Sequence, residues 1–359
     1  MNSKIIKKRI RTIRHRLREK QINCLIATKP PNVTYTTGFL GDDSWAVLTA
    51  RAVYLLTDSR YIEQAKDECL CCKIIQRSSN LPEAAAELVK KLKSVRTVAV
   101  EKSTSLASFD ALKKQLKGRL KTAPNIIESA RTIKDNTEIA AIRAAARIAT
   151  QALRKIRRHI KTGITENELA GTLDFQVRKL GARNSFETIV AFGANASRPH
   201  HQPSRRKLKR NDTILIDFGV RYKSYCCDLT RCFSIGRSSP LYKKAYNAVR
   251  EAQIAAIKSV KAGVEIRHVD AAAREVIASH DFPVYGHPTG HGLGLEVHEE
   301  PAIVAKTKGK LKAGMVFTIE PGVYIPRKLG VRIEDNILVT DSGCKILTRS
   351  YPQKPLQLT

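Results

Sequence analysis

The fold of this chain rests on one stretch of sequence, Asp212-Thr-Ile-Leu-Ile-Asp217-Phe-Gly219 followed by Tyr225-Cys-Cys-Asp228-Leu-Thr-Arg231. Its apolar residues predict two buried strands that form an antiparallel hairpin. We expect the chain to turn around Tyr222 and Lys223. That register places Asp217 directly opposite Asp228, with both carboxylates on the same face. Two like charges at this spacing inside an apolar hairpin repel each other unless a divalent cation lies between them.

A second hairpin repeats this arrangement further along the chain. It consists of Val316-Phe-Thr-Ile-Glu320-Pro-Gly322 and Val331-Arg332-Ile-Glu334-Asp335. A turn centred on Arg327 places Glu320 opposite Glu334, again on one face and among apolar residues. A β-bulge would shift either register by one residue, so both pairings depend on regular strands.

Between the hairpins lies a histidine-rich loop, His287-Pro-Thr-Gly-His291-Gly-Leu-Gly-Leu-Glu-Val-His298-Glu-Glu-Pro301. Its glycines allow close backbone approach, and His291 is the natural nitrogen ligand. Four carboxylates and one imidazole make an oxygen-rich donor set, which suits two bridged divalent ions better than a single tetrahedral zinc ion. Either hairpin alone is equally compatible with a pair of surface acids. Both hairpins together with His291 favour a metal site.

Several polar residues near these motifs are further candidates. His200 and His298 are candidates for contacts with a substrate and its transition state, although His200 follows Pro199 in a loop, where a histidine taken alone is by default solvated. His287 is a candidate partner of the metal ligands. Arg332 alternates with Glu334 along its strand and can orient or neutralise a ligand carboxylate.

Composition favours a globular protein with two domains. The chain has 359 residues and a hydrophobic content of 42%. Its formal charge of +31, from 64 Lys and Arg against 33 Asp and Glu, invites a nucleic-acid partner. However, the basic residues lie in separate runs, and neither an RNA-binding aromatic signature nor zinc-finger spacing accompanies them. Solvated basic helix faces are the preferred interpretation, and we expect no nucleic-acid partner.

The cysteines and the apolar runs indicate a compartment. The eight cysteines lie in apolar segments and do not form the paired C-x-x-C motifs of a zinc ribbon, so a reducing environment is expected. The N-terminus has no apolar run of signal-peptide length, and no later segment has the length of a membrane span. We therefore expect a cytoplasmic protein with no membrane partner.

The two domains are predicted to differ in class. In residues 1–128, short strand-like runs alternate with helical stretches, which indicates an α/β domain. The strand-like runs are Ile22–Ala27, Trp45–Thr49, Val53–Thr57 and Val98–Val100. In residues 129–359, a capping box at Thr165-Glu-Asn-Glu168 and long amphipathic patterns predict several helices. We expect an α+β domain whose helices flank one antiparallel sheet that holds both hairpins.

Taken in order, these motifs resemble those of the pita-bread metallopeptidases. The matching pieces are Asp217-Phe-Gly, Asp228-Leu-Thr-Arg231, His291-Gly-Leu-Gly-Leu-Glu-Val-His298-Glu, Thr318-Ile-Glu320-Pro-Gly and Arg332-Ile-Glu334-Asp335. The likeness is nearest to the Xaa-Pro aminopeptidases and the Xaa-Pro dipeptidases (prolidases). It covers nearly the whole chain, because Tyr35-Thr-Thr-Gly-Phe39 and Thr57-Asp-Ser-Arg-Tyr61 resemble parts of the creatinase/prolidase N-terminal domain.

The resemblance implies a role for each matching residue. Two divalent ions, first of all manganese and otherwise cobalt or zinc, would be bound by Asp217, Asp228, His291, Glu320 and Glu334. A hydroxide bridging the ions would attack the scissile carbonyl, with Glu320 handling the proton. His200 and His298 match histidines that contact the substrate and stabilise the tetrahedral intermediate. His287 matches a further histidine of the pocket, and Tyr324 and Arg332 match residues that support the metal ligands.

The implied function is an Xaa-Pro aminopeptidase, a homodimer that acts on peptides with proline at the second position. Xaa-Pro dipeptidases share the motifs and differ in closing the pocket on the C-terminal carboxylate, so they stay open as an alternative. Methionine aminopeptidases share the ligands but usually lack the N-terminal domain, and creatinases do without the metal ligands. A catalytically silent module that binds nucleic acid is a remote alternative, against which the complete ligand set argues.

Overall fold

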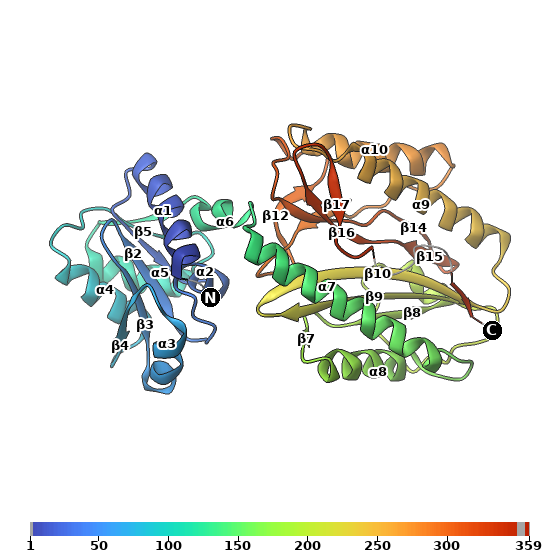
Figure 1. Ribbon diagram of the computed structural model, residues 1–359, viewed down its shortest axis with the longest axis horizontal. Coiled ribbons are helices and arrows are strands. Elements are labelled where there is room, and N and C mark those ends of the chain that lie inside the picture. Colours follow the sequence, from blue (N-terminus) through green and yellow to red (C-terminus); the bar gives the residue numbers. More distant parts are fainter. Residues whose placement is uncertain (1–2, 350–355, 359) are drawn as a thin grey trace. The chain divides into compact units, whose positions relative to one another are not determined.

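The computed structural model describes residues 3–349 and 356–358, and the chain divides into two compact units, Met1–Arg131 and Thr132–Thr359 (Figure 1). Each unit has its own hydrophobic core. Among the described residues, no helix combines the length and the apolar character needed to cross a membrane.

The first unit is a six-stranded sheet with helices packed against it (Figure 1). In spatial order its strands are β4 (Lys73–Gln76), β3 (Val53–Thr57), β2 (Trp45–Thr49), β1 (Cys24–Ala27), β5 (Val98–Glu101) and β6 (Leu120–Ala123). Its helices are α1 (Ser3–Glu19), α2 (Pro30–Thr37), α3 (Ile62–Glu68), α4 (Leu81–Lys91), α5 (Leu106–Leu116) and α6 (Ile126–Arg131), with the 3₁₀ helix η1 (Ser59–Tyr61) before α3. Strand β2 is antiparallel to both neighbours and the other pairs are parallel. The predicted α/β alternation and its strands are confirmed.

Helix α2 is an element of this unit that local sequence did not predict. Its valine and threonines favour strands. The backbone N–H groups of Thr28 and Lys29, which precede the helix, donate to one oxygen of the buried Glu101 carboxylate at 2.8 Å each. Gly38, at φ 88°, ends the helix in the left-handed conformation. A carboxylate from the distant strand β5 therefore stabilises the helix start and overrides the strand propensity.

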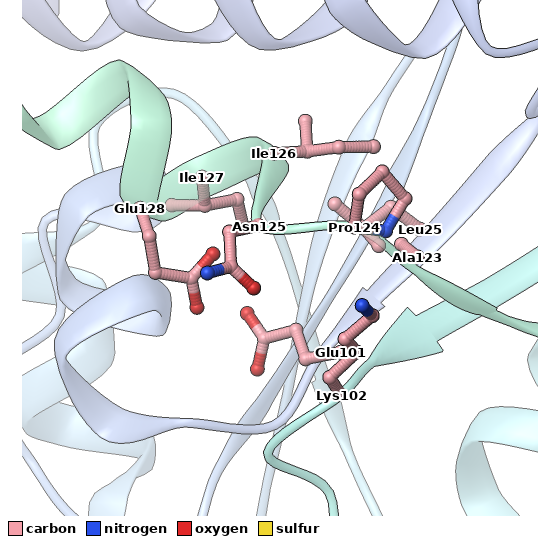
Figure 2. A pocket seen from close by; sticks show the side chains of 9 residues that line it. All are labelled: Leu25, Glu101, Lys102, Ala123, Pro124, Asn125, Ile126, Ile127 and Glu128. Atoms are coloured by element: carbon pink, nitrogen blue, oxygen red, sulfur yellow. The ribbon is translucent and has the colours of Figure 1, made fainter. Parts of the chain in front are cut away.

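A small cavity lies at this contact (Figure 2). Its volume of about 10 Å³ is roughly the space of one water molecule. Figure 2 shows the side chains of Glu101 and Glu128 among the residues that line the cavity. The side-chain amide of Asn32 donates to both carboxylates at 2.7 Å. The cavity is too small for a peptide. Its carboxylates accept hydrogen bonds from the start of α2 and from Asn32 within that helix.

The second unit places its helices on the outer faces of its sheets. The helices are α7 (Asn136–Ile156), α8 (Glu166–Lys179), α9 (Pro240–Ser259) and α10 (Ile266–Ser279), with the 3₁₀ helices η2 (Arg157–His159) and η3 (Gly193–Ser197). One sheet has the order β18 (Leu356–Leu358), β10 (Tyr225–Ile235), β9 (Thr213–Tyr222), β7 (Arg183–Asn184), and β8 (Ile189–Phe192) also pairs with β9. A second has the order β12 (Glu299–Ile303), β11 (Gly290–Gly292), β13 (Val316–Ile319), β16 (Asp335–Val339), β17 (Cys344–Ile346). Strands β14 (Gly322–Ile325) and β15 (Leu329–Arg332) form a separate pair.

Two apolar layers hold this unit together. Helices α7 and α8 pack on β8, β9 and β10, whereas α9 packs on β13, β14 and β15, and α10 packs on α9 and β12 (Figure 1). Capping boxes begin α7, at Asp135 and Glu138, and α8, at Thr165 and Glu168, the second as predicted. The site acids lie on the strands between these layers.

The register predicted for the first hairpin was wrong by two residues. The ladder pairs Tyr222 with Tyr225, Asp217 with Thr230 and Asp228 with Gly219. The turn therefore falls at Lys223 and Ser224, both with positive φ (47° and 68°), which is the two-residue turn whose twist matches that of the flanking strands. Because side chains alternate with a period of two, a shift of two residues leaves both aspartates on one face.

The second hairpin has the predicted register but lies elsewhere than expected. Gly322 pairs with Arg332 and Ile319 with Asp335, and the turn residue Arg327 has φ 59°. The expectation of one sheet for both hairpins was wrong, since β9 and β10 belong to one sheet and β13 and β16 to another. The backbone N–H of Glu334 donates to the Thr230 carbonyl at 3.2 Å and so joins the two layers.

Candidate metal centre

Five acidic or imidazole side chains meet where the two sheets of the second unit approach each other. They are Asp217 on β9, Asp228 on β10, His291 on β11, Glu320 directly after β13 and Glu334 directly before β16. Glu320 and Glu334 lie opposite each other in the gap between the ladders of β13–β16 and β14–β15. Strand geometry therefore brings these residues together from positions that are far apart in the sequence.

Distances define the centre of this group. One ligand atom each from Asp228, His291 and Glu334 lies within 4.8 Å of the others. The imidazole Nε2 of His291 is 3.3 Å from Oε1 of Glu320 and 3.7 Å from Oδ2 of Asp228. Asp217 reaches the group from the side, and its charge acts on Asp228, Glu320 and Glu334. These spacings suit atoms that share a cation.

Electrostatics indicate that the group needs a cation. Burial, together with the neighbouring negative charges, raises the pKa of Asp228 and Glu334 well above the usual range of carboxyl groups. Burial also raises the pKa of Glu320. One buried oxygen each of Asp217, Asp228 and Glu334 has no hydrogen-bond partner within the described residues. Buried orphan oxygens are rare, and a hard divalent cation satisfies them, so the residues present fit such an ion.

His291 has the protonation state that a metal ligand requires. Burial lowers the pKa of its imidazole, which keeps the ring neutral near pH 7. Its Nδ1 lies 3.1 Å from the carbonyl oxygen of Gly292, a contact that assigns the proton to Nδ1 and leaves Nε2 as the free donor atom. This is the nitrogen that faces Asp228 and Glu320.

Three residues to which sequence analysis assigned no role hold the candidate ligands in place. The Thr230 hydroxyl donates to Oε2 of Glu334 at 2.7 Å, and the Thr318 hydroxyl donates to Oε1 of Glu320 at 3.0 Å. The side chain of Asn336 bonds both the backbone N–H and the carbonyl of Asp228. Thr230 and Thr318 lie inside the quoted motifs and Asn336 directly follows one, but a threonine or asparagine in a strand carries no signal of its own partner.

Arg332 organises the other side of the centre. Its guanidinium forms a short ion pair with Oδ2 of Asp217 and donates to the Tyr324 hydroxyl at 2.8 Å. That hydroxyl lies 3.0 Å from Nε2 of His287. Because Oδ2 of Asp217 is occupied by Arg332, its other oxygen remains for a metal ion. Burial raises the pKa of Tyr324 to about 12, so the phenol stays protonated and can donate onward to His287.

The two remaining histidines lie at the open side of the group. The ring of His298 meets that of His291 edge-on, with centroids 4.3 Å apart. Burial lowers the pKa of His298, to which the nearby His291 and His200 contribute. His200 is exposed and follows Pro199, whose carbonyl accepts a hydrogen bond from Arg332 at 3.3 Å. Both imidazoles are therefore placed beside the metal ligands with their edges toward solvent.

The fold and the donor set describe a candidate divalent-metal centre, and comparison with known proteins identifies the family. Residues 140–341 match metallopeptidase family M24, and residues 9–133 match the creatinase/prolidase N-terminal domain. The chain belongs to metallopeptidase family M24.

Similar proteins cover nearly the whole chain. An uncharacterized peptidase of Bacillus subtilis is 37% identical over 335 residues, which are 92% of this chain and 94% of that protein. The structure of the Xaa-Pro dipeptidase from Bacillus anthracis is 33% identical with a TM-score of 0.95, covering 98% of this chain and 100% of that one. The X-Pro aminopeptidase from Thermotoga maritima is 35% identical with a TM-score of 0.87, covering 95% and 99%.

These similarities confirm the expected architecture, an α/β domain of the creatinase/prolidase type followed by an α+β pita-bread domain. They also confirm that the protein is a metallo-exopeptidase of the Xaa-Pro dipeptidase and aminopeptidase group. The nucleic-acid-binding alternative is not favoured.

Proposed function

We propose that this protein is an Xaa-Pro aminopeptidase that uses two divalent cations to hydrolyse the bond between an N-terminal residue and proline. One observation carries the proposal above all others. Asp217, Asp228 and Glu334 each have a buried oxygen without a hydrogen-bond partner within the described residues, next to His291 and Glu320. A buried carboxylate pair is stable in this state only with cations to compensate it.

The chain's own residues would divide the work. The metal ions would be held by Asp217, Asp228, His291, Glu320 and Glu334. Two divalent cations bound there supply a Lewis acid and lower the pKa of water. Glu320 would accept and return the proton, a role that suits a carboxyl group whose pKa is raised by burial and whose Oε1 is held by the Thr318 hydroxyl.

The histidines would act on the substrate carbonyl. His200 and His298 stand at the open side of the metal ligands and would donate hydrogen bonds to the oxygen that becomes negative in the transition state. A neutral His298, favoured by the lowered pKa, retains one N–H for this purpose. His287, Tyr324 and Arg332 would hold Asp217 and the wall of the pocket through their hydrogen-bond chain.

A dedicated enzyme for this bond has a physical reason. Proline carries no amide N–H and fixes its own φ, so the strand-like pairing by which many peptidases hold substrates fails beside it. A pocket with preorganised donors to the carbonyl replaces that pairing.

The choice of an aminopeptidase over a dipeptidase rests on Arg332, which is paired with Asp217 beside the candidate metal ligands. A dipeptidase must neutralise the C-terminal carboxylate of its substrate. All three guanidinium nitrogens of Arg332 already have partners, in Thr230, Tyr324, Pro199 and Asp217. The Xaa-Pro dipeptidase is the second candidate, and it is favoured by the similarity to the Bacillus anthracis structure.

A matched pair of substrates distinguishes the two. The protein is treated with chelator, loaded with manganese, and given Ala-Pro or Ala-Pro-Ala, with release of alanine as the readout. Metal-dependent cleavage of the tripeptide supports the aminopeptidase. Cleavage confined to the dipeptide makes the protein a prolidase. No cleavage of either peptide with manganese, cobalt or zinc would refute both.

The metal, the assembly and the compartment are parts of the same proposal. The four carboxylates favour manganese over zinc, because oxygen-rich sites suit harder ions. The resemblance to the family supports a homodimer, which sedimentation of the purified protein tests directly. All eight cysteines are free, which supports a reducing cytoplasm. Cys69 and Cys72 form the single C-x-x-C spacing in the sequence.

A further inference from the structure

One buried carboxylate outside the metal centre binds both ends of the segment that carries His200. Oε1 of Glu166 accepts hydrogen bonds from the backbone N–H of Phe192 at 2.8 Å and from the side-chain amide of Asn195 at 2.9 Å. Oε2 accepts from the backbone N–H of Ser204 at 3.0 Å and from the Ser204 hydroxyl at 2.5 Å. The same oxygen lies 2.9 Å from Nε2 of the buried His201. Glu166 thus closes residues 192–204, the His200 loop, into a ring.

This carboxylate is not needed to start its own helix. Glu166 is the first residue of α8 and is fully buried. The helix already has a complete capping box, formed by Thr165 and Glu168. A buried carboxylate is costly unless it is fully hydrogen-bonded, and here every bond goes to the His200 loop. The residue therefore serves the loop rather than the helix.

The opposite side of the His200 loop contacts the metal centre. Gly330 on β15 lies so close to it that an added Cβ would be 1.7 Å from the Ala196 carbonyl oxygen. Arg332, which pairs with Asp217, donates to the carbonyl of Pro199, the residue before His200. The loop is consequently held between Glu166 on one side and the β14–β15 pair on the other, with His200 at its exposed edge.

We propose that Glu166 is a positioning residue that sets the location of the His200 imidazole relative to the metal ligands. This proposal rests on the proposed function, in which His200 contacts the substrate carbonyl. Such contacts tolerate little error, because a displacement of about 1 Å can lower the rate by about a hundredfold. An ordered loop keeps His200 in place before the substrate binds. The conformational entropy of the loop is therefore lost during folding and not during substrate binding.

Hydrogen exchange of the metal-loaded protein tests the structural half without substrate. In Glu166→Gln, an amide NH₂ group replaces one acceptor oxygen. This NH₂ group cannot accept the hydrogen bonds that the loop donates to that oxygen. We expect amide exchange within residues 192–204 to accelerate by tenfold or more, roughly one lost charged hydrogen bond, while β9 and β13 keep their protection. Glu168→Gln is the matched control, since it weakens the cap of the same helix without touching the loop. Unchanged exchange in Glu166→Gln, or equal acceleration in both variants, would overturn the proposal.

Kinetics test whether Glu166 acts on catalysis through His200. The test is a double-mutant cycle of Glu166→Gln and His200→Ala, measured with whichever of Ala-Pro and Ala-Pro-Ala the wild-type protein cleaves. If Glu166 acts through His200, Glu166→Gln lowers kcat by about a hundredfold with little change in KM, and the double variant is no slower than His200→Ala alone. Losses that multiply in the double variant would assign Glu166 a general structural role and refute positioning. Metal affinity, measured by titration, should be the same in wild type and Glu166→Gln.

A milder variant keeps the test valid if Glu166→Gln does not fold. Ser204→Ala removes one of the bonds to Glu166 and should change exchange and kcat in the same direction by a smaller factor; no change in either would count against the proposal. If the wild-type protein cleaves neither peptide, the proposed function fails, and hydrogen exchange still decides whether Glu166 orders the His200 loop.

Discussion

At the scale of single residues, two carboxylates of the candidate metal centre use one oxygen for a protein contact and leave the other without a hydrogen-bond partner among the described residues. Asp217 gives one oxygen to Arg332, and Glu334 gives one to the Thr230 hydroxyl, while the other oxygen of each has no hydrogen-bond partner within the described residues. A carboxylate fixed through one oxygen cannot rotate to hide the other. The free oxygens are thereby preorganised for cations, at the cost of repulsion in their absence.

Replacement of Glu320 by Gln should remove catalysis while leaving most of the fold intact. Gln has the size of Glu but accepts no proton, so we expect kcat to fall by about two to four orders of magnitude. Circular dichroism and the melting temperature should stay close to wild type. Glu275→Gln, on the exposed face of α10, is the control and should keep full activity. Turnover near wild type in Glu320→Gln would refute the assignment of the centre.

Removal of the metal should destabilise the protein increasingly as the pH rises. The folded-state pKa of Asp228, Glu320 and Glu334 is raised, so the folded protein retains protons that the unfolded chain releases above its ordinary values of 3.8 and 4.5. This contribution to stability is present below those values and is lost as the pH rises through the raised ones. The melting temperature of metal-free protein should therefore fall as the pH rises above about 5.

Metal loading should abolish that fall. At a hundredfold excess over Kd, one bound ion stabilises by about 2.7 kcal/mol, which raises the melting temperature of a chain this size by roughly 3–4 °C. Differential scanning calorimetry with and without manganese measures both effects. A metal-free protein whose melting temperature is flat or rises over this range would contradict the reading of the buried acids.

At the scale of elements, close strand contacts hold His291 against Glu320. A Cβ built on Gly290 would lie 1.8 Å from the Thr318 carbonyl oxygen, so β11 and β13 approach to a distance that only glycine permits. The Thr318 hydroxyl accepts from the backbone N–H of His291 and donates to Glu320. One threonine of β13 therefore contacts both His291 and Glu320, two of the candidate metal ligands.

Gly290→Ala should therefore separate these two ligands. We expect a loss of about 1–3 kcal/mol in the free energy of unfolding and a fall of about tenfold to a hundredfold in metal affinity. Gly286→Ala, in the segment before β11, is the matched control, because a Cβ there meets nothing within 4 Å. Chemical denaturation and metal titration measure the two effects. Equal behaviour of the two variants would show that the close contact is not needed.

At the scale of the whole molecule, the charge of +31 concerns partners more than fold. Any binding to nucleic acid should be electrostatic and should collapse between about 50 and 200 mM salt. Fluorescence anisotropy with duplex DNA and with single-stranded RNA measures this. Sequence-specific binding that survives at the higher salt would revive a nucleic-acid role beside the peptidase.

The sequence by itself determined the elements with strong local patterns. Apolar runs located β9, β10, β13 and β16, capping residues located α8, and the acids of the two predicted hairpins together with His291 predicted a metal centre. The strand and helix predictions are local, because each depends on residues a few positions apart, whereas the metal-centre prediction also required the register of each hairpin. Helix α2 was missed because its start depends on Glu101, a residue of another strand.

Tertiary structure alone decided the register and the supporting contacts. The two-residue shift in the pairing of Asp217 and Asp228 follows from a turn at Lys223 and Ser224, which both have positive φ. Lysine and serine do not predict positive φ. Thr230, Asn336 and Glu166 received no functional reading from sequence, because their partners lie tens of residues away and only packing of the layers brings them together. Residue types set which chemistry is possible, whereas the packing of sheets and loops sets which atoms meet.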